Sequence, residues 1–283
     1  MEAKEAEDLE IELLLEALRQ RCGFDFQHYS QASLRRRLRH SLLPFNFEHI
    51  SEAIPRIIHD RTFLDKLIYT LSVTVTELFR DPPFYRKVRE KVIPILKTFP
   101  FINIWHAGCA TGEEVYSMAI ILKEEGLLDR ARIYATDING KSLEQAREGI
   151  YSIENLRDYT KNYQKAGGKL SLSDYYHSKY DLVRMDPELK ENVVFANYNL
   201  VTDNVFTEVH LVFCRNVLIY FDRTLQDRVL NLFHDSLVRG GVLCLGTKES
   251  IGFSDVSGKF TTLSDHLKIY QKRSQLYYTP SHG

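Results

Sequence analysis

Residues 105–114, with the sequence WHAGCATGEE, decide the fold of this chain. An apolar run at 101–105 leads into this stretch, and apolar side chains at helical spacing follow it over 112–125. A strand, a tight turn and a helix in this order form a corner at which backbone N–H groups can hold a polar ligand. Gly108 and Gly112 allow the backbone to approach such a ligand closely. The stretch therefore predicts a ligand-binding corner at the edge of a sheet.

The charge of this corner indicates which ligand it binds. The corner lacks the G-x-G-x-x-G pattern of dinucleotide-binding enzymes. Glu113 and Glu114 lie at the helix start, where their carboxylates would repel a pyrophosphate and attract a cationic ligand. We therefore expect an aminoacyl sulfonium, S-adenosylmethionine, in place of NAD. Thr111 and Glu114 also match a T-x-x-E capping box, so Glu114 is either a helix cap or a ligand contact.

Strands and helices alternate from residue 101 onward. Strands are expected at 101–105, 132–136, 193–195, 209–213, 242–245 and 267–270, and helices at 112–125, 141–148 and 223–237. This alternation predicts an α/β fold with a parallel, doubly wound sheet. Residues 155–190 are rich in Tyr, Ser, Lys and Gly and fit no long helix, so a small antiparallel β insertion is expected around 160–190.

The N-terminal part of the chain is predicted to be helical. Apolar side chains recur at helical spacing over 7–20, 30–42, 47–59 and 61–71. Asp81-Pro82-Pro83 is typical of a helix start, with Asp81 as the cap of a helix over 82–97. The sequence thus predicts a helical domain at 1–80, a linker helix at 81–100 and an α/β domain at 101–283.

Composition excludes several classes of protein. The chain has 283 residues, of which 44% are hydrophobic, and its formal net charge of −1 gives no general attraction to nucleic acid. The acidic first residues do not match a signal peptide, and Arg215 and Asn216 interrupt the apolar run at 211–221, so neither export nor membrane insertion is expected. The cysteines include no C-x-x-C pair, and we expect reduced thiols of a cytoplasmic protein without disulfides or a metal site at Cys22, Cys109, Cys214 and Cys244.

Polar residues follow two of the expected strands. Asp137 ends the second strand, where a carboxylate can accept both hydroxyls of a ribose, or it caps the next helix, a role that Asn139 fits equally well. Arg215 and Asn216 follow a later strand among apolar residues, which is unfavourable unless they meet a ligand or a partner. An internal salt bridge or a bond that fixes the loop is the alternative for this pair.

Arginines form two further candidate sites. Arg80, at the junction of the two domains, either clamps a carboxylate through two parallel hydrogen bonds or is a solvated charge. Residues 35–39 include four arginines, which form either the wet face of a helix or a docking patch for an acidic partner. Nucleic acid is not expected there, because no aromatic residues are interleaved with the arginines.

Short segments match one known family over nearly the whole chain, from about residue 8 to residue 273. They are TELFRD at 76–81, WHAGCATGEEVY at 105–116, ATDI at 135–138, AREGIY at 146–151, NL at 199–200, FCRNVLIYFD at 213–222 and GTKES at 246–250. Together they make this chain resemble the chemotaxis receptor methyltransferase (CheR) family. The resemblance implies a helical N-terminal domain, a Rossmann-like domain that uses S-adenosylmethionine, and a small inserted antiparallel β-subdomain.

The resemblance also implies an activity. Members of this family transfer the methyl group of S-adenosylmethionine to glutamate side chains on chemoreceptor helices, which yields glutamyl methyl esters and S-adenosylhomocysteine. The chain is then expected to be a monomeric, cytoplasmic protein-glutamate O-methyltransferase. Its partner would be the cytoplasmic helical domain of a chemoreceptor, with no role for nucleic acid, a metal ion or direct membrane insertion.

The functional residues of the family carry over to matching positions in this chain. Cofactor contacts are implied for Thr76, Arg80, Glu114, Asp137, Asn199, Leu200, Arg215 and Asn216, and for Thr74, which stands where the family usually has Asn. A catalytic role is implied for Arg80, Asp137 and Tyr220, of which Tyr220 matches a tyrosine near the transfer site.

The resemblance identifies receptor contacts as well. Arg36, Arg37 and Arg39 match the receptor-binding arginines of the second helix of the family. Some members also bind a receptor C-terminal peptide through a Gly-x-x-Gly turn in the β-subdomain. This chain has Gly167-Gly168 instead, so tethering to such a peptide is not expected.

Other functions are compatible with parts of the sequence. A dinucleotide-dependent oxidoreductase would need the glycine-rich corner that is missing here. A non-catalytic signalling module would bind S-adenosylmethionine without turnover. A methyltransferase for nucleic acid or a small molecule would not form a glutamyl ester, which releases methanol in mild alkali.

Overall fold

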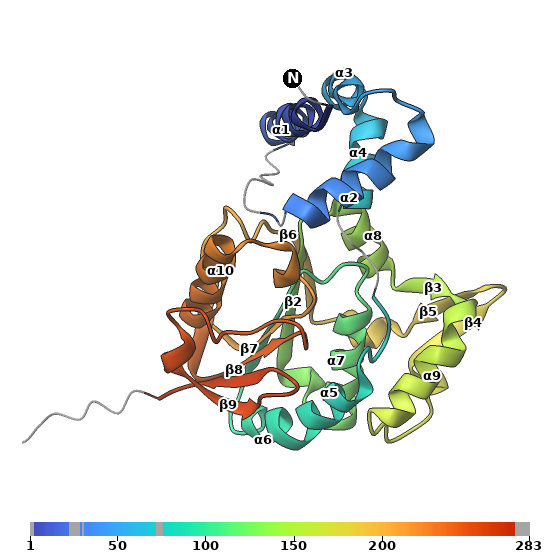
Figure 1. Ribbon diagram of the computed structural model, residues 1–283. Helices are drawn as coiled ribbons and strands as arrows, with labels where there is room; N and C mark the ends of the chain where they lie inside the picture. The colour runs from blue at the N-terminus through green and yellow to red at the C-terminus, as the bar shows by residue number, and fades with distance from the viewer. Residues whose placement is uncertain (1–2, 23–28, 30, 72–75, 275–283) are drawn as a thin grey trace, which may run out of the picture.

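The computed structural model describes residues 3–22, 29, 31–71 and 76–274, and the N-terminal part of the chain forms a small helical bundle (Figure 1). Its helices are α1 Ala3–Cys22, α2 Gln31–Leu42, α3 Ala53–His59 and α4 Arg61–Leu71. Leu14 and Leu18 of α1 pack with Leu34 and Leu38 of α2 in one buried core, because each pair lies one helical turn apart. The four expected helices are confirmed, although the third begins only at Ala53.

A seven-stranded sheet forms the centre of the remaining chain, in the order β6-β2-β1-β7-β8-β10-β9. Its strands are β1 Ile102–Ala107, β2 Ala131–Asp137, β6 Val193–Asn197, β7 Val209–Cys214, β8 Leu237–Leu245, β9 Phe260–Ser264 and β10 Ile269–Lys272. The first five strands in this order are parallel, as expected, whereas β10 runs antiparallel to both β8 and β9. The sequence missed β9, because this edge strand exposes Thr261 and Thr262 and lacks an apolar run.

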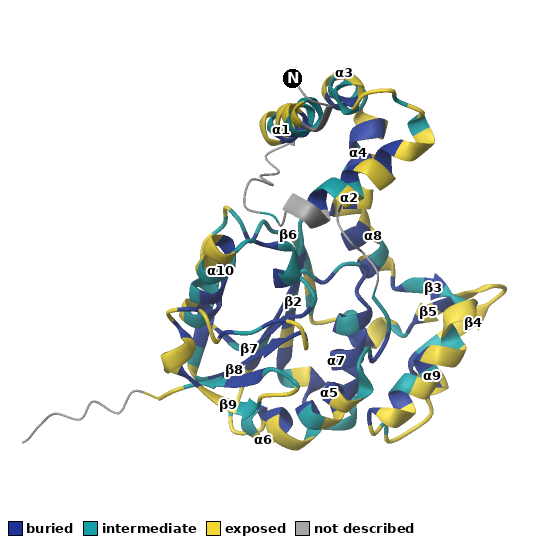
Figure 2. Ribbon diagram, in the orientation of Figure 1, coloured by how far each residue is buried: buried dark blue, intermediate teal, exposed yellow. Residues whose placement is uncertain are grey.

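Helices cover both faces of the sheet, and Figure 2 shows the buried strands between them. α7 Glu113–Glu124 and α8 Gly140–Glu148 pack on one face, and α10 Arg223–Ser236 packs on the other. Trp105 of β1 is fully buried on the α10 side, where its ring centroid lies 5.3 Å from that of Phe233. The sheet is therefore doubly wound, as the sequence predicted.

One helix leads from the bundle into the sheet. α5 Pro82–Lys87 continues through a π-helical turn at Val88–Val92 into α6 Ile93–Leu96, close to the expected helix at 82–97. The expectation that Asp81 caps this helix is wrong, because its backbone is left-handed (φ 60°) and its side chain makes no cap bond. The Asp81 carboxylate instead accepts a hydrogen bond from Arg215, at a sequence separation of 134 residues.

The insertion is a small three-stranded antiparallel sheet, as expected, with one helix beside it. The strands are β3 Ile150–Ser152, β4 Tyr176–Lys179 and β5 Leu182–Met185, in the order β3-β5-β4. The ten-residue helix α9 Leu156–Lys165 was not expected, since its buried positions are tyrosines within a polar sequence. Gly167-Gly168 follows α9, so this pair is not the turn between two strands of the insertion.

The strand order creates a crevice at one edge of the sheet. From β1 the chain continues on one side to β2 and β6, and it returns on the other side of β1 as β7 and β8. In open parallel sheets, ligands bind outside the carboxyl ends of the strands at the point where the order reverses, which here lies between β1 and β7. In the part of the chain that is described, no helix is long and apolar enough to cross a bilayer.

Gly149, which ends α8, offers a direct test of this packing. It has φ 65°, and a Cβ atom there would lie 2.4 Å from the Tyr116 hydroxyl. We expect Gly149→Ala to lower the free energy of unfolding by at least about 1 kcal/mol, because the left-handed backbone alone costs that much. Gly140→Ala is the matched control, since a Cβ there meets no atom within 4 Å. Urea unfolding of both variants measures the difference in free energy. Equal stabilities would contradict this account of how the end of α8 packs against Tyr116.

Candidate functional site

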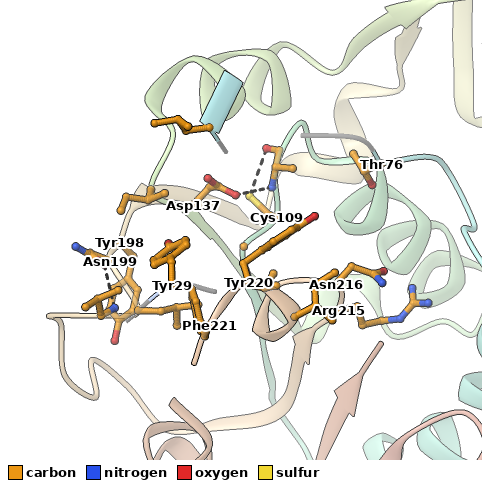
Figure 3. A pocket seen from close by; sticks show the side chains of 18 of the residues that line it. Tyr29, Thr76, Cys109, Asp137, Tyr198, Asn199, Arg215, Asn216, Tyr220 and Phe221 are labelled. Carbon is orange, nitrogen blue, oxygen red and sulfur yellow. Dashed lines mark hydrogen bonds between the residues drawn. The ribbon is translucent and has the colours of Figure 1, made fainter. Parts of the chain in front are cut away.

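A cavity of about 190 Å³ lies where the carboxyl ends of the central strands meet the helical bundle (Figure 3). The loops after β1, β2, β6 and β7 form one wall of it. The other wall includes residues of the N-terminal part of the chain, namely Tyr29, Arg37, Ile68 and Leu71. The cavity thus occupies the crevice that the strand order creates.

The turn after β1 forms the floor of the cavity. Gly108 has φ 78°, and a Cβ atom there would lie 2.5 Å from a methyl group of Val217. The N–H groups of Gly108 and Cys109 both donate to the carbonyl of Thr136, so this turn is fixed to the end of β2. Gly108 is therefore needed for packing against the loop after β7.

Asp137 lines the cavity at the end of β2 (Figure 3). One carboxylate oxygen accepts the N–H of Ala110 at 2.8 Å and the other accepts the N–H of Asn139 at 2.8 Å. Burial raises the pKa of Asp137, and these backbone bonds oppose the rise. Because each carboxylate oxygen has two lone pairs, both retain capacity for a ligand hydroxyl. Asn139 caps α8 by accepting from Lys141 and Ser142, which leaves Asp137 available to the cavity.

Arg215, after β7, is the buried cation of the site. Its guanidinium donates to Glu114 at 3.0 Å and to Asp81 at 2.7 Å, and its side chain is 2% exposed. It also lies 4.0 Å from the ring centroid of Phe84. The expected alternative of an internal salt bridge is therefore correct, and Arg215 lines the cavity as well.

Glu114 is not part of a capping box, so that expectation is wrong. The cap position of α7 is Gly112, which makes no side-chain bond, and the hydroxyl of Thr111 donates to Glu113. Glu114 contacts His106 at 3.3 Å and accepts from Arg215. Burial raises the pKa of Glu114, but the bonds from His106 and Arg215 outweigh that effect and lower it. An ionised carboxylate therefore lines the cavity.

The arginines of α2 differ in what they contact. Arg37 lies 4.6 Å from the ring centroid of Tyr220 and donates to the carbonyl of Leu71, so it forms part of the cavity wall. Arg39 makes two bonds to Glu7, at 2.6 and 2.8 Å. Arg36 is exposed and does not line the cavity. The docking patch expected from the sequence is thus divided between the cavity and the outer surface of the helix.

The cavity brings together most of the site residues that the sequence predicted. Those that line it are Thr76, Arg80, Glu114, Asp137, Asn199, Leu200, Arg215, Asn216 and Tyr220. Thr74 lies outside the described residues. Sequence reasoning missed Tyr29 and Phe221, whose rings meet edge to face at 5.0 Å, because their contact joins two distant parts of the chain. Tyr198 also lines the cavity, and the sequence could have predicted this, because Tyr198 directly follows β6.

Two buried thiols lie at the cavity or next to it, Cys109 in its lining and Cys214 beside Arg215. Burial raises the pKa of Cys109 and of Cys214, so both thiols are protonated. No group of three His, Cys, Asp or Glu residues that could hold a metal ion occurs in the described ranges. The arrangement can instead bind a ligand with hydroxyls, a cationic group and an apolar ring.

The residues that line the cavity fit S-adenosylmethionine. Asp137 has acceptors for ribose hydroxyls, Glu114 has a negative charge for an ammonium group, and Leu200 and Tyr198 offer an apolar wall. The Nε atom of Arg215 is buried and has no hydrogen-bond partner among the described residues. Fold and cavity together define a Rossmann-like methyltransferase that depends on S-adenosylmethionine.

Comparison with known proteins identifies the family. Residues 74–268 match the SAM-binding domain of CheR methyltransferases, and residues 9–72 match the all-alpha domain of CheR methyltransferases. The chain belongs to the CheR methyltransferase family.

Individual relatives match most of the chain. It is 49% identical over 265 residues to a Pseudomonas putida protein named putative methyltransferase Cher3, with 94% of this chain and 97% of that protein covered. It is 28% identical over 231 residues to the chemotaxis protein methyltransferase of Listeria innocua, with 81% and 85% covered. It is 29% identical over 258 residues to chemotaxis protein methyltransferase 1 of Vibrio cholerae, with 84% and 88% covered.

Glu113, next to Glu114, is a buried carboxyl that is not among the residues lining the cavity. It is 4% exposed, and burial raises its pKa from 4.5 to about 7, although the hydroxyls of Thr111 and Tyr159 oppose the rise. The rings of Tyr116 and Tyr151 lie near it. Burial is the main cause that raises the pKa of both tyrosines, and the negative charge of Glu113 raises these pKa values further.

Ionisation of Glu113 should therefore lower stability. Because its pKa is higher in the folded than in the unfolded chain, its contribution is complete below about pH 4.5 and is lost as the pH rises through about 7. We expect the free energy of unfolding of the wild type to fall relative to that of Glu113→Gln, by roughly 1–3 kcal/mol between pH 5 and pH 8. Urea unfolding at both pH values measures this difference, and a constant difference would show that Glu113 does not titrate in this range.

Proposed function

We propose that this chain transfers the methyl group of S-adenosylmethionine to glutamate side chains of chemoreceptors and so forms glutamyl methyl esters. The observation that carries the proposal is the division of one cavity between two kinds of charge. Asp137 lines the cavity at the end of β2 and Glu114 at the start of α7, whereas Arg37 lies beside Tyr220 at the helical wall. A cationic cofactor suits the first part, and an incoming carboxylate suits the second. The names of the Listeria and Vibrio relatives, chemotaxis protein methyltransferases, agree with this substrate class.

The cofactor half of the cavity has a residue for each polar group of the ligand. We assign the ribose to Asp137, the amino group to Glu114 and the methionyl carboxylate to Arg80. Asn199 and Leu200 would hold the adenine ring, since the Asn199 side chain accepts from the Val201 N–H and orders the loop after β6. Thr76, Arg215 and Asn216 complete the wall. S-adenosylmethionine, when bound, supplies an activated methyl group on a sulfonium centre.

The acceptor half does not have to remove a proton. A glutamate carboxylate has an ordinary pKa near 4.3 and is already an anionic nucleophile at neutral pH. Burial raises the pKa of Tyr220, so its hydroxyl is protonated and can donate to the acceptor, while the Arg37 guanidinium supplies positive charge. The residues then act by alignment and by excluding water, which can lower a barrier by as much as about 7–11 kcal/mol.

The protein partner follows from the same charges. A receptor segment that carries several glutamates is acidic, and α2 presents Arg36 to solvent beside the cavity wall that holds Arg37. We therefore propose that the cytoplasmic helical domain of a chemoreceptor docks along α2. This proposal places the chain in the cytoplasm.

Methyl-labelled S-adenosylmethionine and purified receptor cytoplasmic domains test the function. We expect label on the receptor that is released as methanol in mild alkali, because glutamyl methyl esters hydrolyse under conditions in which N-methyl groups survive. Label that resists alkali would indicate a different substrate. Tight cofactor binding with no label on any receptor domain would indicate a signalling module without catalysis.

Arg37 and Arg36 make a matched pair for the acceptor half. We expect Arg37→Ala to lower kcat/KM for receptor methylation about tenfold or more, because it removes positive charge from the cavity wall. Arg36→Ala, one residue away on the exposed face, should lower kcat/KM by a smaller factor, and it should do so by raising KM. Calorimetry with S-adenosylhomocysteine checks that both variants retain the cofactor site. Equal losses in the two variants would place Arg37 outside the acceptor half.

A further inference from the structure

The carboxylate of Glu249 lies outside the cavity, buried in the turn after β8. Glu249 is 4% exposed, and its two oxygens accept four backbone N–H groups. One oxygen accepts from Gly246 at 2.6 Å and from Asn216 at 3.0 Å. The other accepts from Val217 at 2.9 Å and from Ile219 at 3.3 Å. Three of these four bonds join the turn to residues 215–221, which we call the transfer loop.

The backbone N–H groups of the transfer loop need hydrogen-bond acceptors from outside the loop. Asn216 has a left-handed backbone (φ 61°), and a 3₁₀ turn at Leu218–Tyr220 follows it. The first N–H groups of a helical turn have no partner within the turn, so a buried loop of this kind needs an external acceptor. Burial raises the pKa of Glu249, and the four N–H groups that surround it stabilise its charged form against that effect. The carboxylate therefore acts as a cap supplied by a separate turn.

The transfer loop is also held on both sides by close packing. A Cβ atom on Gly246 would lie 2.8 Å from a Glu249 carboxylate oxygen and 2.9 Å from the backbone nitrogen of Asn216. On the other side, Val217 fills the space that a side chain on Gly108 would need. The loop cannot shift toward the turn after β1 without a collision. Its position is thus determined by Glu249 and by the cofactor corner together.

Most residues of the transfer loop line the cavity. Asn216 and Tyr220 line it, and Figure 3 shows both on the loop that ends near Phe221. We propose that Glu249 is a positioning residue for methyl transfer, which holds the transfer loop so that Tyr220 faces the acceptor carboxylate. The inference rests on the proposed function, and it assigns a role to a residue that contacts neither cofactor nor acceptor.

Glu249→Gln is the first test. The substitution keeps the size of the side chain but replaces one acceptor oxygen with an NH₂ donor, which then faces two N–H groups. We expect kcat for receptor methylation to fall about 10- to 100-fold, since a small displacement of reacting groups has effects of that size. The affinity for S-adenosylhomocysteine should fall less than kcat, because Asp137 at the end of β2 and Glu114 in α7 keep their positions. Of the proposed cofactor contacts, only Arg215 and Asn216 belong to the transfer loop. Glu188→Gln, whose exposed side chain pairs with Lys123, is the matched control and should keep its kcat.

A double-mutant cycle separates positioning from general destabilisation. If Glu249 acts through Tyr220, Glu249→Gln should lower kcat by a much smaller factor in a Tyr220→Ala background than in the wild type. The same loss of kcat in both backgrounds would overturn the inference. Gly246→Ala displaces the carboxylate without removing it, and it takes the place of Glu249→Gln in the cycle if that variant does not fold. A wild-type protein that methylates no receptor would instead contradict the proposed function, whatever the cycle shows.

Discussion

The ion pairs of Arg215 are the constraint on which the rest of this structure depends. A guanidinium that is 2% exposed is tolerable only when its charge is matched, and here Glu114 and Asp81 match it. Glu114 lies in the first turn of α7, Asp81 precedes α5, and Arg215 follows β7, so one side chain joins three segments. Loss of the Arg215 guanidinium would cost about 3–5 kcal/mol, because the Glu114 carboxylate would remain largely buried without its cation. The loops around the crevice are therefore fixed relative to one another.

That constraint also explains how charge is distributed in the cavity. Glu114 stays ionised because Arg215 and His106 lower its pKa, and Asp137 retains free acceptor capacity beside backbone N–H groups. Asp137 lies at the end of β2 and Glu114 in the first turn of α7, on the side where a sulfonium cofactor is expected. Arg37 reaches the same cavity from α2 and stacks on Tyr220. The helical bundle thus supplies part of the cavity wall, which would connect the proposed docking on α2 with the proposed transfer site.

The sequence predicts those parts of the site that follow from local order. Asp137 and Arg215 could be placed because each directly follows a strand, and parallel strands bring their carboxyl ends to one edge. It could not predict partners that lie far apart in the chain. Asp81 has the sequence pattern of a helix cap but accepts a hydrogen bond from Arg215 instead. Glu114 has the T-x-x-E pattern of a capping box, yet its carboxylate accepts from the same guanidinium. In both cases a buried cation outweighs a local cap, because an unmatched charge costs more than a lost cap.

A crystal structure with bound S-adenosylhomocysteine tests the central claim most directly. The account predicts ribose hydroxyls within hydrogen-bond distance of Asp137, the ligand amino group at Glu114, and Arg215 still paired with both Glu114 and Asp81. A ligand bound away from these carboxylates, or an Arg215 side chain released from Glu114, would contradict it.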